Sequence, residues 1–159
     1  MVSGSRGQST DLLNTPLARE LLAAPLIANL ATRSKDGAIH LVPMWFLWDG
    51  TDLLIPTSGT TQKARNIERD PRVSVMIDDS RAGLNLRGVT IRGEATLVRA
   101  PVSFQLNRAI HLKYITAAQR DLGPVDAYLG SDDVTVRIRA HGVYSWDLSD
   151  TAAQRALES

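Results

Sequence analysis

The sequence predicts a mainly β (α+β) domain in which about six antiparallel strands form a barrel with a few helices around it. Short apolar runs follow one another with turn signals between them, such as Ser34-Lys35-Asp36-Gly37 and Asp49-Gly50. Strands and helices do not alternate in the rhythm that a parallel sheet requires. The 159 residues, 43% of them hydrophobic, are enough for one domain with a substantial core. Closure into a barrel is expected because it removes exposed strand edges.

The first half of the chain reads as a short helix followed by an antiparallel meander. Thr15 suits an N-cap, Pro16 suits the first helical position, and Pro25 ends the helix. Strands are expected over 26–32, 38–48 and 53–57.

The second half begins with a predicted helix over 62–69, which Asp70-Pro71 ends. Strands are predicted over 72–77, 86–98 and 134–146, with a turn over 78–83 and a helical stretch from 101 to about 122. We expect a flexible N-terminus over 1–12, a single domain over 13–148, and a polar tail over 149–159.

Composition and charge argue against several classes of protein. The 18 basic and 17 acidic side chains give a formal charge of +1, which argues against a general electrostatic attraction to nucleic acid or membrane. The absence of cysteine excludes disulfides, thiolate metal sites and a cysteine nucleophile. No apolar run could span a bilayer, and the first residues lack a signal-peptide core, so a cytoplasmic protein is expected.

The best local candidate for a binding site is the segment 57–66, which combines a strand end, a hydroxyl-rich turn and a helix N-terminus. Free backbone N–H groups, the Thr and Ser hydroxyls, and Lys63 in the first turn would together suit a phosphate monoester. A capped helix with solvated basic residues would carry the same pattern.

A second candidate feature is the strand around Pro43. Pro43 cannot donate a hydrogen bond to a neighbouring strand, so one side of this strand is expected to be an edge. Trp45 and Trp48 lie close to this edge, where a flat conjugated ring could rest, although both could equally belong to the core or to a dimer contact.

The three histidines, His40, His111 and His141, show no metal-ligand spacing, and no metal site is predicted. Each reads as an ordinary polar or half-buried residue, and haem ligation by one of them stays an open alternative.

Four segments in this order resemble the pyridoxamine 5′-phosphate oxidase-like superfamily, and within it the flavin/deazaflavin-dependent oxidoreductase branch. They are A-T-R-S-K-D-G at 31–37, V-P-M-W-F at 42–46, T-Q-K-A-R-N at 61–66 and D-P-R-V-S at 70–74. The resemblance covers roughly 26–98, with a weaker echo at 134–146. It implies a six-stranded antiparallel split β-barrel that forms a homodimer, with two cofactor sites at the interface.

The resemblance also implies a set of cofactor-binding positions. The segment that holds the cofactor phosphate corresponds to Thr57, Ser58, Thr61, Gln62 and Lys63. The strand along the ring system corresponds to His40, Val42, Pro43, Met44 and Trp45. Arg87 and Gly88 fall near a position that contacts cofactor in some relatives, and Trp146 near an aromatic residue that the partner subunit contributes.

Departures from the vitamin B6 oxidases argue against oxidation of pyridoxamine phosphate. Those oxidases place basic residues where this chain has His40, Trp45 and Gln62, and their C-terminal R-L-H element is absent here. The resemblance therefore implies a coenzyme F-420- or FMN-dependent reductase of a small molecule, with the deazaflavin slightly favoured. The hydride chemistry would belong to the cofactor, and no catalytic side chain is identified. The alternative is a non-catalytic flavin or haem carrier on the same barrel.

Overall fold

The computed structural model describes residues 4–5, 10–80, 86–149, 151 and 155–156. Most of the predicted flexible N-terminus and polar tail, and half of the predicted turn over 78–83, lie outside these residues. The elements in chain order are β1 (Gly4–Ser5), a 3-10 helix (Thr10–Asn14), α1 (Pro16–Ala23), β2 (Ala28–Arg33), β3 (Ile39–Met44), β4 (Leu47–Trp48), β5 (Leu53–Thr57), α2 (Gln62–Arg69), β6 (Arg72–Asp78), β7 (Arg87–Arg99), α3 (Val102–Tyr114), α4 (Ala117–Arg120), α5 (Gly123–Leu129) and β8 (Val134–Asp147).

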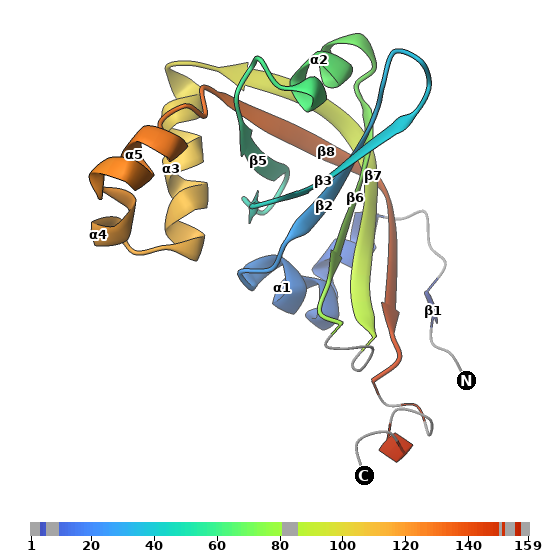
Figure 1. The fold of residues 1–159 in the computed structure, drawn as a ribbon. Coiled ribbons are helices and arrows are strands. Elements are labelled where there is room, and N and C mark those ends of the chain that lie inside the picture. The colour runs from blue at the N-terminus through green and yellow to red at the C-terminus, as the bar shows by residue number, and fades with distance from the viewer. Residues whose placement is uncertain (1–3, 6–9, 81–85, 150, 152–154, 157–159) are drawn as a thin grey trace.

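The strands form one antiparallel sheet with the order β3-β2-β6-β7-β8-β5-β4, and β1 pairs with β8 (Figure 1). The two ends of this order, β3 and β4, follow each other directly in the chain, so the sheet curls back on itself without a closing ladder between them. The predicted split barrel is confirmed. Its six longer strands correspond to the predicted ones, although β4 lies within the single strand predicted over 38–48. β1 is an additional strand of two residues.

The core lies inside this curved sheet, with α1 packed against it. In β6 the burial pattern alternates, because Val73, Val75 and Ile77 face inward. The inward residues of β8, Val136 and Ile138, are fully buried.

Local sequence signals at the turns and at the first helix are confirmed. Gly37 and Gly50 adopt φ values of 89° and 96°, which side chains with a Cβ rarely tolerate. The Thr15 hydroxyl accepts a hydrogen bond from the Ala18 amide at the start of α1, and Pro16 is the first residue of that helix.

The prediction of one strand over 38–48 is wrong, because the chain leaves the sheet between β3 and β4. The Phe46 amide donates to the Tyr114 hydroxyl at 3.0 Å, and that hydroxyl donates to the Leu26 carbonyl at 2.7 Å. The Phe46 side chain is fully buried in the core. A tertiary contact with α3 therefore replaces the strand ladder at this point.

The predicted helical stretch over 101–122 is instead three helices that extend to Leu129. A second helix starts after Thr116, whose side chain and backbone form a capping box with Gln119. Apolar residues of α3 are divided between solvent and core, because Phe104 and Leu112 are 50% and 41% exposed whereas Ile110 is buried. Figure 1 shows α3, α4 and α5 grouped beside β5 at one end of the barrel.

Candidate functional site

A cavity of about 500 Å³ lies where β3 ends, β5 leads into α2, and the chain leaves α5; we call it the β3–α2 cavity. This volume lies within the range of small-molecule and cofactor sites. Its lining residues are Pro43, Met44, Trp45, Pro56, Thr57, Ser58, Thr61, Lys63, Tyr128, Leu129, Ser131 and Asp132. The cavity thus brings together three of the residues predicted along the ring and four of those predicted around the phosphate.

The α2 end of the cavity is a capped helix N-terminus. Thr61 accepts from the Ala64 amide and donates to the Ser58 carbonyl at 2.8 Å, so its hydroxyl is used by the cap. Thr57 lies 3.2 Å from the Thr61 hydroxyl and is buried. The cap leaves the Gln62 and Lys63 amides as the unbonded donors of the first turn, because these positions have no intrahelical partner. The donors offered to an anion are therefore backbone amides and the Lys63 ammonium.

Lys63 differs from a solvated surface lysine because its side chain is half-buried against the cavity. Desolvation lowers the pKa of its ammonium group, and the nearby Asp132 carboxylate partly opposes this effect. Within the described residues no carboxylate lies within ion-pair distance of Lys63. A bound anion would supply the missing counter-charge.

The β3 end of the cavity has a fixed aromatic wall. The Trp45 indole stacks on Tyr114 at 4.7 Å between ring centroids, with 3° between the planes, and meets His111 edge-on at 6.2 Å. β3 is the terminal strand of the sheet order, as Pro43 predicted. Among the described residues β3 has a strand partner on one side only, so its other edge can offer backbone hydrogen bonds to a ligand.

The wall formed by Tyr128, Leu129, Ser131 and Asp132 was not predicted. Polar side chains on the inner face of α3 hold this segment in place. Asn107 donates to the Asp132 carbonyl at 2.9 Å, and Ser103 donates to the Asp133 carbonyl at 2.7 Å. The available signal was the spacing of Ser103, Asn107 and His111, which puts one polar stripe on one helix face.

The other predicted residues do not line this cavity. His40 and Val42 are half-buried in β3, and Gln62 lies in a separate depression beside Ser34, Lys35 and Asp36. Arg87 is paired with Glu20 and Asp79. Gly88 lies against the Trp146 indole, since a Cβ at Gly88 would meet that ring at 2.2 Å.

Trp146 also lies far from the cavity within one chain. It is close to the end of β8, whereas the start of β8, Val134, pairs with Thr57 at the cavity. Twelve residues separate Val134 from Trp146, a path of roughly 40 Å along the strand at about 3.3 Å per residue.

In the part of the chain that the structure describes, none of the histidines belongs to a cluster large enough to bind a metal ion. Both ring nitrogens of the buried His111 are hydrogen-bonded, to Arg120 and to Asp132. His141 is exposed at the irregularity where β8 faces Gly93. Within the described ranges no group of three or more His, Asp or Glu side chains could hold a metal ion.

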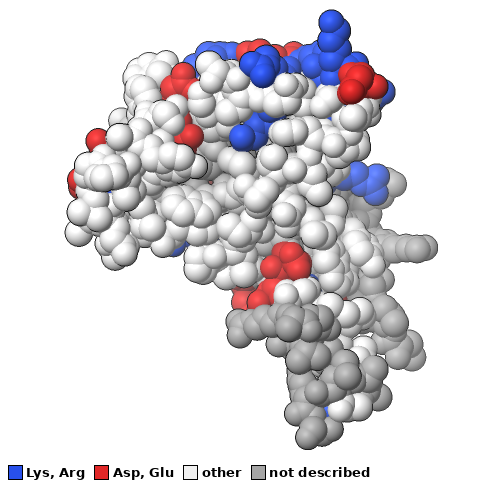
Figure 2. Space-filling model, viewed as in Figure 1, with Lys and Arg blue, Asp and Glu red and all other residues white. Residues whose placement is uncertain are grey.

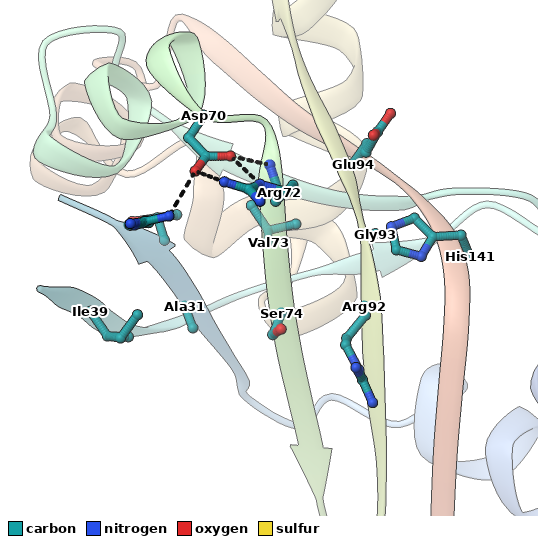
Figure 3. A pocket seen from close by; sticks show the side chains of 12 residues that line it. Ala31, Ile39, Asp70, Arg72, Val73, Ser74, Arg92, Gly93, Glu94 and His141 are labelled. Carbon is teal, nitrogen blue, oxygen red and sulfur yellow. Dashed lines mark hydrogen bonds and ion pairs between the residues drawn. The ribbon is translucent and has the colours of Figure 1, made fainter. Parts of the chain in front are cut away.

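A second pocket lies on the outer face of the sheet (Figure 3). Asp70 makes hydrogen-bonded ion pairs with Arg72 there, and these hold the pKa of its carboxyl at about 2. Arg92, Glu94 and His141 line the same pocket further along the sheet. The pocket shares its outer sheet face with exposed apolar residues of β3.

The fold and the cavity together define a split-barrel domain whose sheet edge and helix N-terminus meet at one cavity. The family model described as pyridoxamine 5′-phosphate oxidase matches residues 15–147. The chain therefore belongs to this family. No helix in the described part of the chain has both the length and the apolar character needed to cross a membrane.

Several solved structures are similar to this chain in fold. An F420 reductase is 29% identical with a TM-score of 0.63, and the match covers 79% of this chain and 94% of that one. A conserved hypothetical protein from Mycobacterium tuberculosis is 32% identical with a TM-score of 0.65, covering 88% and 84% of the two chains. HutZ, the heme storage protein from Vibrio cholerae, shares the fold at 18% identity, with a TM-score of 0.63 and coverage of 84% and 96%. No curated protein matches the sequence significantly.

Proposed function

We propose that this protein binds a flavin or deazaflavin cofactor in the β3–α2 cavity and uses it as an oxidoreductase for a small molecule. The observation that carries the proposal is Lys63, a half-buried ammonium group in the cavity that has no acidic partner at ion-pair distance among the described residues. It lies beside the unbonded amides at the start of α2, a combination that suits a phosphate.

Coenzyme F-420 is the cofactor that we favour, with FMN as the second candidate. The F420 reductase at 29% identity supports this order. Figure 2 shows Lys and Arg side chains, with fewer Asp and Glu among them, over the end of the barrel formed by α2 and the β2–β3 hairpin. A basic surface beside the cavity suits a cofactor that carries more than one negative charge.

The residues of the chain would bind and orient the cofactor, which itself supplies hydride transfer. Lys63 and the α2 amides would hold its phosphate. The free edge of β3 would bond to the polar edge of the ring. Trp45, which Tyr114 holds by stacking, would cover one face and exclude water there.

We also propose that two copies pair through the outer face of the sheet. Ile39 and Leu41 of β3 are 68% and 63% exposed, and Met76 of β6 is 40% exposed. Strand register puts one row across this face: Pro43, Asn29, Met76, Thr90 and Tyr144. Exposed apolar side chains such as Ile39, Leu41 and Met76 on one sheet face are typical of an interface. Pairing also supports the expectation that Trp146 reaches the partner's cofactor, since it is remote from the cavity of its own chain.

The function is tested by titrating the purified protein with FMN and with coenzyme F-420 while following tryptophan fluorescence. Saturable binding of F-420 without FMN supports the deazaflavin proposal and leads to a screen of reducible substrates. Binding of FMN alone moves the protein to the flavin side. If neither ring binds to well-folded protein, the proposal fails.

Three further measurements address the carrier alternative and the dimer. A carrier binds the cofactor without substrate-dependent reoxidation, and a haem carrier shows a Soret band that substitution of His40 or His141 abolishes. For the dimer, sedimentation of the wild type should give twice the monomer mass, and the double variant Leu41→Glu/Met76→Glu should sediment as a monomer. A monomeric wild type at micromolar concentration would contradict the pairing.

A further inference from the structure

A chain of buried polar groups leads from the surface of the helical segment into the β3–α2 cavity. The Arg120 guanidinium, 7% exposed, donates from Nε to His111 Nδ1 at 3.1 Å. The His111 ring is 1% exposed, and its Nε2 lies 3.2 Å from the Asp132 carboxylate. Asp126 holds the far end of Arg120 at 2.6 Å. A buried arginine, which is rare in proteins, and a buried histidine thus support one carboxylate at the cavity wall.

The donor and acceptor capacities of these side chains fix the direction of each hydrogen bond in the series. A guanidinium can only donate, so Nδ1 of His111 is the acceptor from Arg120. The proton of the neutral ring is therefore on Nε2, and that N–H donates to the Asp132 Oδ2. Asp132 is held at its backbone too, through Asn107. Its carboxylate is pre-oriented, and in the described part of the chain its Oδ1 has no hydrogen-bond partner.

The cavity thus contains one cation and one anion that are not bonded to each other. Lys63 comes from the first turn of α2 and Asp132 from the segment after α5, and within the described residues the two do not form an ion pair. A ligand that carries only negative charge would satisfy Lys63 and be repelled by Asp132. A ligand that has a hydroxyl donor next to its phosphate would satisfy both groups.

We propose that Asp132, positioned by His111, is a specificity-determining residue that accepts a hydrogen bond from a hydroxyl group of the cofactor's polyol chain beside the phosphate bound to Lys63. The inference rests on the proposed function and deepens it. Asp132 selects ligands in which a polyol joins ring and phosphate, and His111 acts through Asp132 as a positioning residue.

The test uses a series of three ligands built on whichever ring the wild type binds. For a flavin these are FMN, riboflavin and lumiflavin; for a deazaflavin they are coenzyme F-420, its phosphate-free ribityl form and the bare ring. The variant Asp132→Asn keeps the shape and the acceptor for His111 but removes the charge. Asp121→Asn, an exposed acid on the same helical segment that pairs with Arg108, is the control.

We expect Asp132→Asn to raise the dissociation constants of the two ribityl ligands by about 10-fold or more, the size expected for a hydrogen bond to a charged group, and to leave the bare ring unchanged. The control should bind all three as the wild type does. His111→Gln should lower the affinity for the two ribityl ligands by a smaller factor and leave binding of the bare ring unchanged. If Asp132→Asn does not fold, the His111→Gln variant provides the test.

Three outcomes would overturn the inference while leaving the cofactor site intact. These are an unchanged affinity of Asp132→Asn for riboflavin or its deazaflavin counterpart, an equal loss for all three ligands, and tighter binding of the phosphate-bearing ligand alone. A wild type that binds none of the rings would instead overturn the proposed function, and this inference with it.

Discussion

Replacement of Lys63 by alanine is the most direct perturbation of the proposed site. The ammonium group is the one full positive charge among the residues that line the β3–α2 cavity in the described structure. A charge-assisted hydrogen bond contributes about 1.5–3 kcal/mol, so Lys63→Ala should raise the dissociation constant of a phosphate-bearing cofactor by about 10- to 150-fold. Removal of a half-buried charge without a partner should not weaken the fold, since its desolvation cost disappears with it.

The assay is quenching of tryptophan fluorescence by the cofactor at constant ionic strength, with Lys35→Ala as the matched control. Lys35 is exposed on the β2–β3 hairpin near α2, so its loss changes the net charge equally without entering the cavity. If Lys35→Ala loses no more than about twofold in affinity, the loss on Lys63→Ala is due to the direct contact of Lys63 with the cofactor and not to the change in net charge.

The contact between Lys63 and a cofactor phosphate also predicts how binding depends on the ligand and on pH. The loss on Lys63→Ala should vanish for a ligand without phosphate. The pKa of Lys63 is lowered by desolvation, so wild-type affinity should fall on the alkaline side at a lower pH than for a solvated lysine with its ordinary value of 10.5. Unchanged cofactor affinity of Lys63→Ala, or an equal loss for phosphate-free ligand, would refute the assignment of Lys63 to the phosphate.

Three further predictions concern the scaffold around the site. Tyr114→Phe leaves a buried amide and a carbonyl unpaired at the break between β3 and β4, and it should lower the free energy of unfolding by about 1–3 kcal/mol in urea denaturation. Gly93→Ala would put a Cβ 2.4 Å from a backbone carbonyl oxygen of β8, and it should cost about 1–3 kcal/mol by the same measurement. The hydrogen bond from Arg139 is the main cause that lowers the pKa of Asp52, and burial opposes it. The stabilisation of the fold by the Asp52 carboxylate is therefore present above pH 3.8, the ordinary pKa, and is lost as pH falls further. Asp52→Asn should make the free energy of unfolding less dependent on pH in this acid range.

Each of these predictions has an outcome that would contradict it. Tyr144→Phe, at a 39% exposed site on the outer sheet face, should be neutral, and an equal loss there would remove the argument from buried hydrogen bonds. Gly142→Ala meets only ordinary contacts, at 3.8 Å, so it should unfold like the wild type. An Asp52→Asn variant that loses stability with falling pH as steeply as the wild type would place the acid sensitivity elsewhere.

The sequence alone determined the elements whose signals are local. The hairpin at Gly37, the cap at Thr15 and the strand β6 depend on neighbours a few residues away, and each took its predicted form. The strand edge at Pro43 was also readable, because a missing N–H group has the same consequence in any sheet. Thr57, Ser58, Thr61 and Lys63, which line the cavity, could also be grouped from the sequence, because they lie within seven consecutive residues.

The tertiary structure decided what depends on long-range contacts. The chain leaves the sheet at Phe46 because the Phe46 amide donates a hydrogen bond to the hydroxyl of Tyr114, 68 residues away. No local sequence pattern predicts this contact. Asp132 enters the cavity because α3 buries a polar stripe and turns exposed apolar residues such as Phe104 outward. Hydrogen bonds from α3 to the start of β8 make the helical segment the far wall of the cavity. Those bonds join residues that become neighbours only after the barrel has closed, which is why sequence periodicity could not place them.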